Sequence, residues 1–129
     1  MVKFKMERIA AHYIYAPPQK VYKLHYVELD ENKQLHKISP LEKEVSGTAF
    51  FNGILILSKT EIQTDWLLNR LKEDDFPEET TIFDFLNSFN REEIRQQDAV
   101  FLYLLDGINL TTTKLRTDNG RCNCHIQRL

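Results

Sequence analysis

Strand-type sequence patterns lie at both ends of this chain, and one helical block separates them. Residues 8–57 and 99–129 contain short apolar runs and alternating apolar and polar side chains, whereas residues 60–97 repeat apolar side chains at helical spacing. This split pattern predicts that the N- and C-terminal strands lie in shared sheets. We therefore expect an α+β fold: a small β-sandwich or partly open barrel built from N- and C-terminal strands, with a helical insertion.

The length and composition are those of one folded domain. The 129 residues are enough to bury a hydrophobic core. With 42% hydrophobic and 28% charged residues, the chain is expected to fold rather than to remain disordered. We divide this single domain, residues 1–129, into a β segment at 8–57, a helical insertion at 60–97 and a β-meander at 99–129.

Four strands are predicted in the first region. They are Ile9–Tyr15, Val21–Leu29, Gln34–Ser39 and Thr48–Leu57. The dipeptide Pro17-Pro18 ends the first of them, because proline cannot donate a hydrogen bond to a neighbouring strand. The polar run at residues 30–33 predicts the turn of a hairpin. Gly53 indicates a β-bulge within the fourth strand.

The helical region is expected to hold two helices and one further helical turn. The predicted N-caps are Thr60 with Gln63, then Thr80 or Thr81, then Asn90 with Glu93. Pro77 separates the first helix from the second. The third cap would open a polar turn of helix that continues through Gln97.

The last region is predicted to form a three-stranded meander. Its strands are Ala99–Leu105, Asn109–Arg116 and Arg121–Leu129. Asp106-Gly107 predicts the first turn. Asn119-Gly120 favours a type I′ hairpin turn, because both residues readily adopt the positive φ angles that this turn requires.

Charge and hydropathy argue against two classes of partner. The formal net charge of −2 gives no electrostatic reason to expect a nucleic acid. No apolar run approaches the roughly 20 residues that cross a membrane, so no membrane partner is expected. The N-terminus lacks the apolar core of a signal peptide, and the cysteines lie only two residues apart. We therefore expect a reducing, cytoplasmic location.

The first region also carries a resemblance to known enzymes. It reads R-I-A-A-H-Y-I-Y from Arg8, K-L-H-Y-V-E-L-D-E-N-K-Q-L-H-K-I-S-P-L from Lys23 and F-N-G-I-L-I-L from Phe51. This order resembles the opening β-segment of amidohydrolase-type metal-dependent hydrolases. Residues 97–102, Q-D-A-V-F-L, resemble a reordered version of the return from the catalytic barrel of those enzymes.

The resemblance covers residues 8–57 and 98–129. It implies that these segments form a composite β-sandwich, and that about 40 residues stand where the enzymes have a barrel of about 250. In the enzymes the strand after the glycine leads into a His-x-His metal motif, but residues 53–59 contain no histidine. No metal ligand is therefore carried over to any position. The chain is expected to be a non-catalytic accessory or protein-interaction module without a cofactor.

Cys122 and Cys124 form the sharpest local cluster. On a strand, their side chains share one face, where two thiolates can bind zinc or copper. A closed zinc site needs four ligands, and the histidines of the N-terminal strands are His12, His25 and His36. The alternatives are strand cysteines without a ligand, a shared metal site, or redox chemistry. Histidines on half-buried strands are also common as hydrogen-bonded packing residues.

Aromatic side chains are dense in the helical region. Trp66, Phe76, Phe85 and Phe89 compete for limited core area, so we expect at least one of them to be exposed or covered only by a second chain. The alternative is that all four are core residues. Three function classes therefore stay open. The first is a module that binds a protein partner or itself. The second is a small-ligand-binding domain with a pocket between helices and sheet. The third is a divergent enzyme or metal protein that uses Cys122, Cys124 and a histidine.

Overall fold

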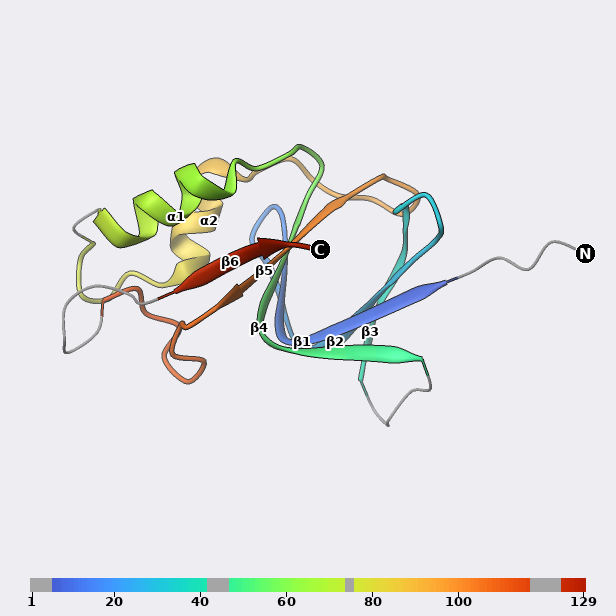
Figure 1. Ribbon diagram of the computed structural model, residues 1–129, viewed down its shortest axis with the longest axis horizontal. Coiled ribbons are helices and arrows are strands. Elements are labelled where there is room, and N and C mark those ends of the chain that lie inside the picture. Colours follow the sequence, from blue (N-terminus) through green and yellow to red (C-terminus); the bar gives the residue numbers. More distant parts are fainter. Residues whose placement is uncertain (1–5, 42–46, 74–75, 117–123) are drawn as a thin grey trace, which may run out of the picture.

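The described part of the chain forms one six-stranded sheet, with two helices at one end of it (Figure 1). The computed structural model describes residues 6–41, 47–73, 76–116 and 124–129. The elements are β1 Glu7–Ala16, β2 Lys20–Leu29, β3 Leu35–Pro40, β4 Thr48–Ser58, α1 Thr64–Glu73, α2 Ile82–Phe89, β5 Phe101–Asp106 and β6 His125–Arg128. The sheet order is β3-β2-β1-β4-β5-β6, and all neighbours are antiparallel except β1 and β4.

N- and C-terminal strands share this sheet, which confirms the predicted pairing of the two strand regions. The link is the β4–β5 ladder, which runs from Ile54 opposite Leu105 to Ser58 opposite Phe101. The fold class is α+β, as expected, and the expected sandwich or partly open barrel is replaced by a single sheet. The described strands lie in one open sheet, neither closed as a barrel nor divided into two packed sheets. The order is linear because β2, β1, β4 and β5 each pair with two strands, which leaves β3 and β6 at opposite edges.

A β-bulge bends β4 at Gly53, as predicted. Ala11 lies opposite Phe51 and Tyr13 lies opposite Ile54, so β4 has one extra residue at this point. Gly53 has a φ of +135°, and a Cβ atom there would stand 2.4 Å from the carbonyl oxygen of Leu105. Only glycine fits both the backbone angle and the close approach of β5. Beyond the bulge, β4 runs between β1 and β5.

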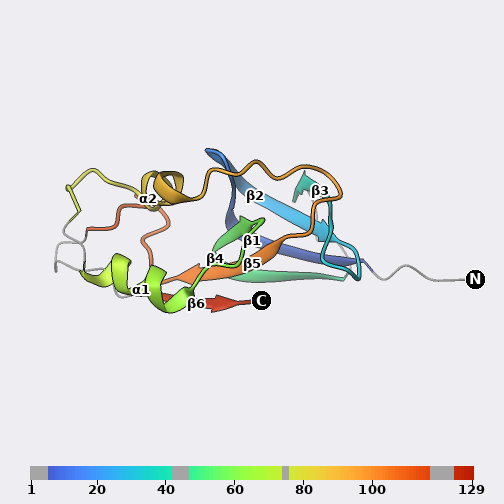
Figure 2. The ribbon, with the colours of Figure 1, turned by 90° about the horizontal axis from the view of Figure 1, so that it is seen from above.

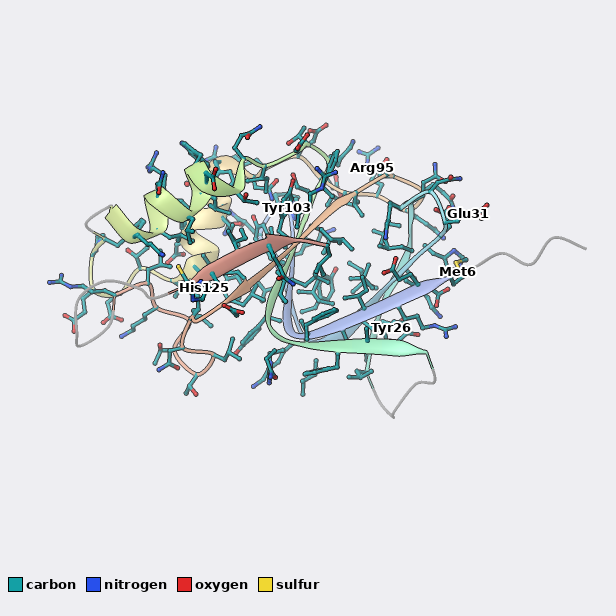
Figure 3. The ribbon with its side chains drawn as sticks, viewed as in Figure 1. Met6, Tyr26, Glu31, Arg95, Tyr103 and His125 are labelled. Carbon is teal, nitrogen blue, oxygen red and sulfur yellow. The ribbon has the colours of Figure 1, made fainter. Side chains whose placement is uncertain are left out.

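Different parts of the chain cover the two faces of the sheet. The helices cover one core, which includes Ile54, Ile56, Leu67, Leu86 and Tyr103. Figure 3 shows Tyr103 in the interior near α1, and the Tyr103 hydroxyl accepts a hydrogen bond from the backbone N–H of Ile62 (2.7 Å). The second core includes Ile9, Ile14, Val27, Leu29, Leu55, Ile94 and Val100. The segment after α2 covers this second core (Figure 2).

The start of the second helix is as predicted, and the start of the first is not. Thr81 caps α2, because Thr81 Oγ1 accepts the Asp84 N–H (3.2 Å) and the Asp84 carboxylate accepts the Thr81 N–H (3.0 Å). Thr60 is not a cap, since α1 begins only at Thr64. Ser58 Oγ instead accepts the Thr60 N–H (3.2 Å), which keeps Thr60 in the bend after β4.

Two further elements expected from sequence are absent from the described residues. Asn90 ends α2 instead of opening another helical turn, since its backbone N–H donates to the carbonyl oxygen of Leu86 (2.8 Å). Asn109–Arg116 is not a strand. The Asn109 side chain accepts the N–H groups of Thr111 (2.9 Å) and Thr112 (3.2 Å), which favours a turn. The predicted three-stranded meander is therefore wrong, and the Asn119-Gly120 turn lies outside the described residues.

Candidate interaction surface

The four aromatic residues singled out from the sequence form one continuous row. The ring centroids of Trp66 on α1 and Phe89 on α2 are 5.3 Å apart, with an interplanar angle of 86°. Phe89 contacts Phe85 (5.4 Å, 63°), and Phe85 contacts Phe76 (5.4 Å, 80°). All three contacts are edge-to-face, the geometry that aromatic pairs prefer. We call these four residues the aromatic row.

Exposure changes along the aromatic row. Phe85 is 6% exposed and belongs to the core under the helices, whereas Phe76 and Phe89 are partly buried against that core. Trp66 is 43% exposed. The expectation that at least one of the four is exposed is therefore met by Trp66. The row connects the core to the surface through ring contacts alone.

Buried hydrogen bonds hold α2 against the sheet. The side-chain amide of Asn90 donates to the carbonyl oxygen of Leu57 on β4 (3.2 Å). The hydroxyl of Tyr15 on β1 lies 3.1 Å from the carbonyl oxygen of Asn90 and also contacts the Asn87 side chain. Because these bonds join the C-terminal end of α2 to two central strands, they fix the position of Phe89. Phe89 in turn supports the Trp66 ring.

The Tyr15 hydroxyl makes this attachment sensitive to alkaline pH. Burial raises the pKa of the Tyr15 phenol above its ordinary value of 10.0, and the backbone hydrogen bond from Gln19 partly opposes the rise. The folded state therefore favours the neutral phenol more than the unfolded state does. This contribution to stability is complete below about pH 10 and is lost as the pH rises through the folded-state pKa.

Replacing Tyr15 with phenylalanine is therefore expected to weaken the pH dependence of stability above about pH 10. The variant should lose about 1 kcal/mol at neutral pH, because the hydroxyl hydrogen bonds disappear. Urea unfolding from pH 8 upwards measures both effects. Equal slopes of unfolding free energy against pH in Tyr15→Phe and wild type would show that Tyr15 does not carry the effect.

A polar rim surrounds the exposed end of the aromatic row. The Arg70 guanidinium carbon lies 5.6 Å from the centroid of the Trp66 ring, one helical turn further along α1. Asp65 and Asn69, on the same helix, are exposed. An aromatic centre with a polar and charged rim is typical of protein–protein contact surfaces.

Only one of the two cysteines lies within the described residues. Cys124 is buried in the core under the helices, and Cys122 lies outside the described residues. Metal binding by Cys122 and Cys124 therefore stays a prediction. No group of three or more His, Cys, Asp or Glu side chains within the described residues has the geometry to hold a metal ion.

The three N-terminal histidines have separate partners. The His12 ring packs edge-on against Phe50 at 5.3 Å. Nδ1 of His25 lies 2.9 Å from the carbonyl oxygen of Lys23. Nε2 of His36 lies 3.8 Å from the carboxylate of Glu28, and that carboxylate accepts a hydrogen bond from Arg8 (3.0 Å). His12 therefore has a packing role and His25 a hydrogen-bonding role, as the alternative to metal binding expects.

Two hollows bear on the possibility of a small ligand. One, of about 470 Å³, lies near the start of β1 and the β2–β3 turn, where Figure 3 labels Met6 and Glu31. It is lined by Met6, Glu7, Asp30, Glu31, Lys33 and Gly47. The other, of about 280 Å³, lies beside residues 99–102. Neither lies between the helices and the sheet, where the ligand-binding alternative expects a pocket. Among the described residues that line the larger hollow, four of six are charged: Glu7, Asp30, Glu31 and Lys33.

Comparison with known proteins identifies no relative, since no family model, curated protein or solved structure matches the chain. Within the described residues, neither helix has the length and apolar character needed to cross a membrane.

Sequence reasoning identified the members of the aromatic row but not their mutual contacts. The spacing of Phe85 and Phe89 places both on one face of α2, whereas the contact of Phe89 with Trp66 depends on how α1 and α2 pack. The attachment of α2 through Tyr15, Asn87 and Asn90 was missed. Its one sequence signal is a pair of asparagines at the end of an apolar helical run, where polar side chains often satisfy backbone groups.

Proposed function

We propose that this protein is a non-catalytic protein-interaction module, and that Trp66 is the centre of its contact surface. The observation that carries the proposal is the aromatic row, which runs from buried Phe85 to exposed Trp66. Large aromatic side chains at the centre of an interface supply much of its binding free energy. Trp66 is such a side chain, because it is exposed and its ring contacts the partly buried ring of Phe89.

The support beneath Trp66 favours binding without rearrangement. Phe89 contacts the Trp66 ring in an edge-to-face arrangement, and the Arg70 guanidinium lies over that ring. A side chain already held in one position loses less conformational entropy when a partner covers it. The ring therefore presents a preorganised apolar contact, and the polar rim supplies hydrogen-bonding groups around it.

The non-catalytic part of the proposal rests on sequence. The segment that resembles the opening β-segment of amidohydrolases lacks the histidines that would hold a metal at the end of β4. A catalytic zinc site requires about three protein ligands and a water position. We accordingly expect the purified protein not to hydrolyse amide or cyclic-amide substrates when metal is added. Metal-stimulated turnover that disappears on substitution of one histidine would contradict this.

Replacing Trp66 with alanine is expected to weaken partner binding by about 30-fold, which corresponds to a hot spot of about 2 kcal/mol. The measurement is quantitative co-purification from the native cell, followed by titration with the purified partner. Met6→Ala is the matched control, because Met6 is also an exposed apolar residue and lies at the opposite end of the sheet from the helices (Figure 3). Equal binding by wild type, Trp66→Ala and Met6→Ala would remove Trp66 from the proposed surface.

A further inference from the structure

The first half of β4 forms an open sheet edge. β1 pairs with β4 from Thr48 onwards, but β5 pairs only with Ile54–Ser58. On the side away from β1, no other described strand pairs with Thr48–Asn52. Figure 1 shows this half of β4 diverging from β5 and β6 at the bend. We call residues 48–52 the β4 edge.

The β4 edge lacks two of the features that commonly protect an exposed strand from pairing, and the bulge at Gly53 lies just after it. Its sequence, Thr-Ala-Phe-Phe-Asn, contains no charge and no proline. The outer strands are better protected, because β3 carries Lys37 and ends at Pro40, and β6 has only four residues, including Arg128. Ala49 is exposed, and Phe50 is 47% exposed. An exposed edge without charge or proline is a template for another strand.

We propose that the β4 edge pairs with the same edge of a second copy of this chain, antiparallel and across a twofold axis. The occupant must be an uncharged strand, because a charged side chain placed against Ala49 and Phe50 would lose hydration without gaining a partner. A second copy supplies such a strand at the matching position. Antiparallel pairing of identical strands gives a closed, isologous dimer, the commonest form of homo-oligomer.

The side chains of the β4 edge complement themselves when the axis passes through Phe50. Phe50 then lies opposite Phe50 of the second copy, on the face where its ring already contacts His12 (5.3 Å). On the other face, exposed Ala49 lies opposite Phe51, so a small side chain meets a large one. Aromatic cross-strand pairs stabilise antiparallel sheets. The pairing also supplies backbone hydrogen bonds to an edge that lacks them in the described structure.

This inference is independent of the proposed function. The β4 edge belongs to the half of β4 that precedes the bend. Trp66 lies on α1, at the other end of the sheet (Figure 1). A dimer through the β4 edge leaves both copies of Trp66 available. It would present two contact surfaces together, which strengthens binding to a partner that carries two copies of the recognised segment.

Charge-reversal mixing tests the dimer, with mass measured by light scattering or sedimentation across a wide range of concentrations. Wild type is expected to reach the dimer mass. Phe50→Lys and Phe50→Glu should each remain monomeric, because residue 50 faces itself and like charges repel. An equimolar mixture of the two variants should recover the dimer, because opposite charges then face each other. Met6→Lys and Met6→Glu are the controls and should dimerise as wild type does.

Circular dichroism establishes that the Phe50 variants are folded. Ala49→Lys places a charge at a second exposed position of the β4 edge and should also prevent dimerisation. A wild-type protein that stays monomeric at the highest concentration overturns the proposal. So does a dimer that survives both Phe50 substitutions, or a mixture of Phe50→Lys and Phe50→Glu that stays monomeric. Trp66-dependent partner capture should persist in monomeric Phe50→Lys, so loss of the dimer and loss of the proposed function are distinguishable.

Discussion

Replacing Gly53 with alanine is expected to destabilise the protein by about 3 kcal/mol or more, since backbone strain and steric overlap each cost about 1–3 kcal/mol. The strain arises because Gly53 has a φ of +135°, an angle that residues with a side chain rarely adopt. The overlap arises because the new Cβ atom would stand 2.4 Å from the carbonyl oxygen of Leu105 and 3.3 Å from its carbonyl carbon. Both atoms belong to the β5 backbone, which cannot move without opening the β4–β5 ladder.

Gly47→Ala is the matched control for this substitution. Gly47 also has a positive φ, of +80°, but a Cβ atom there would have no neighbour among the described residues within 4 Å. It should therefore cost only about 1 kcal/mol, from backbone strain alone. Urea unfolding of the two variants separates strain from overlap. Similar losses at both positions would contradict the close packing of β5 against the bulge.

Replacing Phe85 with alanine is expected to cost about 3–5 kcal/mol of stability, the usual result of removing a buried phenylalanine. Phe85 is 6% exposed and contacts both Phe76 and Phe89. Trp66→Ala should cost only about 1–2 kcal/mol, because it removes one edge-to-face pair and a partly buried surface. The buried and exposed members of the aromatic row therefore differ in what they contribute, stability at Phe85 and binding at Trp66.

Urea unfolding and partner titration on the same variants test this division. Phe85→Leu is the control, since it keeps most of the apolar volume and should cost about 1 kcal/mol. Trp66→Ala should remain folded at room temperature and lose binding. If Trp66→Ala destabilises the isolated protein as much as Phe85→Ala does, Trp66 is a core residue, and the proposed surface loses its main support.

Local chemistry explains why the N-terminal half of the fold was predictable. The strands expected at Ile9–Tyr15 and Thr48–Leu57 are observed at Glu7–Ala16 and Thr48–Ser58. Alternation of apolar and polar side chains, the proline pair and the glycine bulge are all properties of short segments. The parallel pairing of β1 with β4 depends instead on contacts between distant residues. This pairing produces one open sheet where a β-sandwich or partly open barrel was expected.

The errors in the second half also have a physical cause. Thr60, Asn90 and Asn109 are each polar residues with a capping or turn-forming side chain, and such side chains have several local partners available. The backbone N–H of Thr60 donates a hydrogen bond to Ser58 Oγ. The side-chain amide of Asn90 donates to the carbonyl oxygen of Leu57 on a distant strand. Which partner wins is decided by tertiary packing. The aromatic row shows the same division, because composition identified its members and helix packing determined which of them is exposed.

Site-specific photo-crosslinking at residue 66 tests the central claim most directly. Trp66 is replaced by a photoreactive phenylalanine derivative in the native cell, which keeps a large aromatic ring at this position, and the same derivative at Met6 is the control. Met6 is also exposed and lies at the opposite end of the sheet from the helices, outside the proposed surface. The account predicts one saturable protein adduct at position 66 that is absent or much weaker at position 6, and that unlabelled wild-type protein competes away. Adducts that are equal at both positions, or no adduct at position 66, would contradict the claim that Trp66 is the centre of a protein-contact surface.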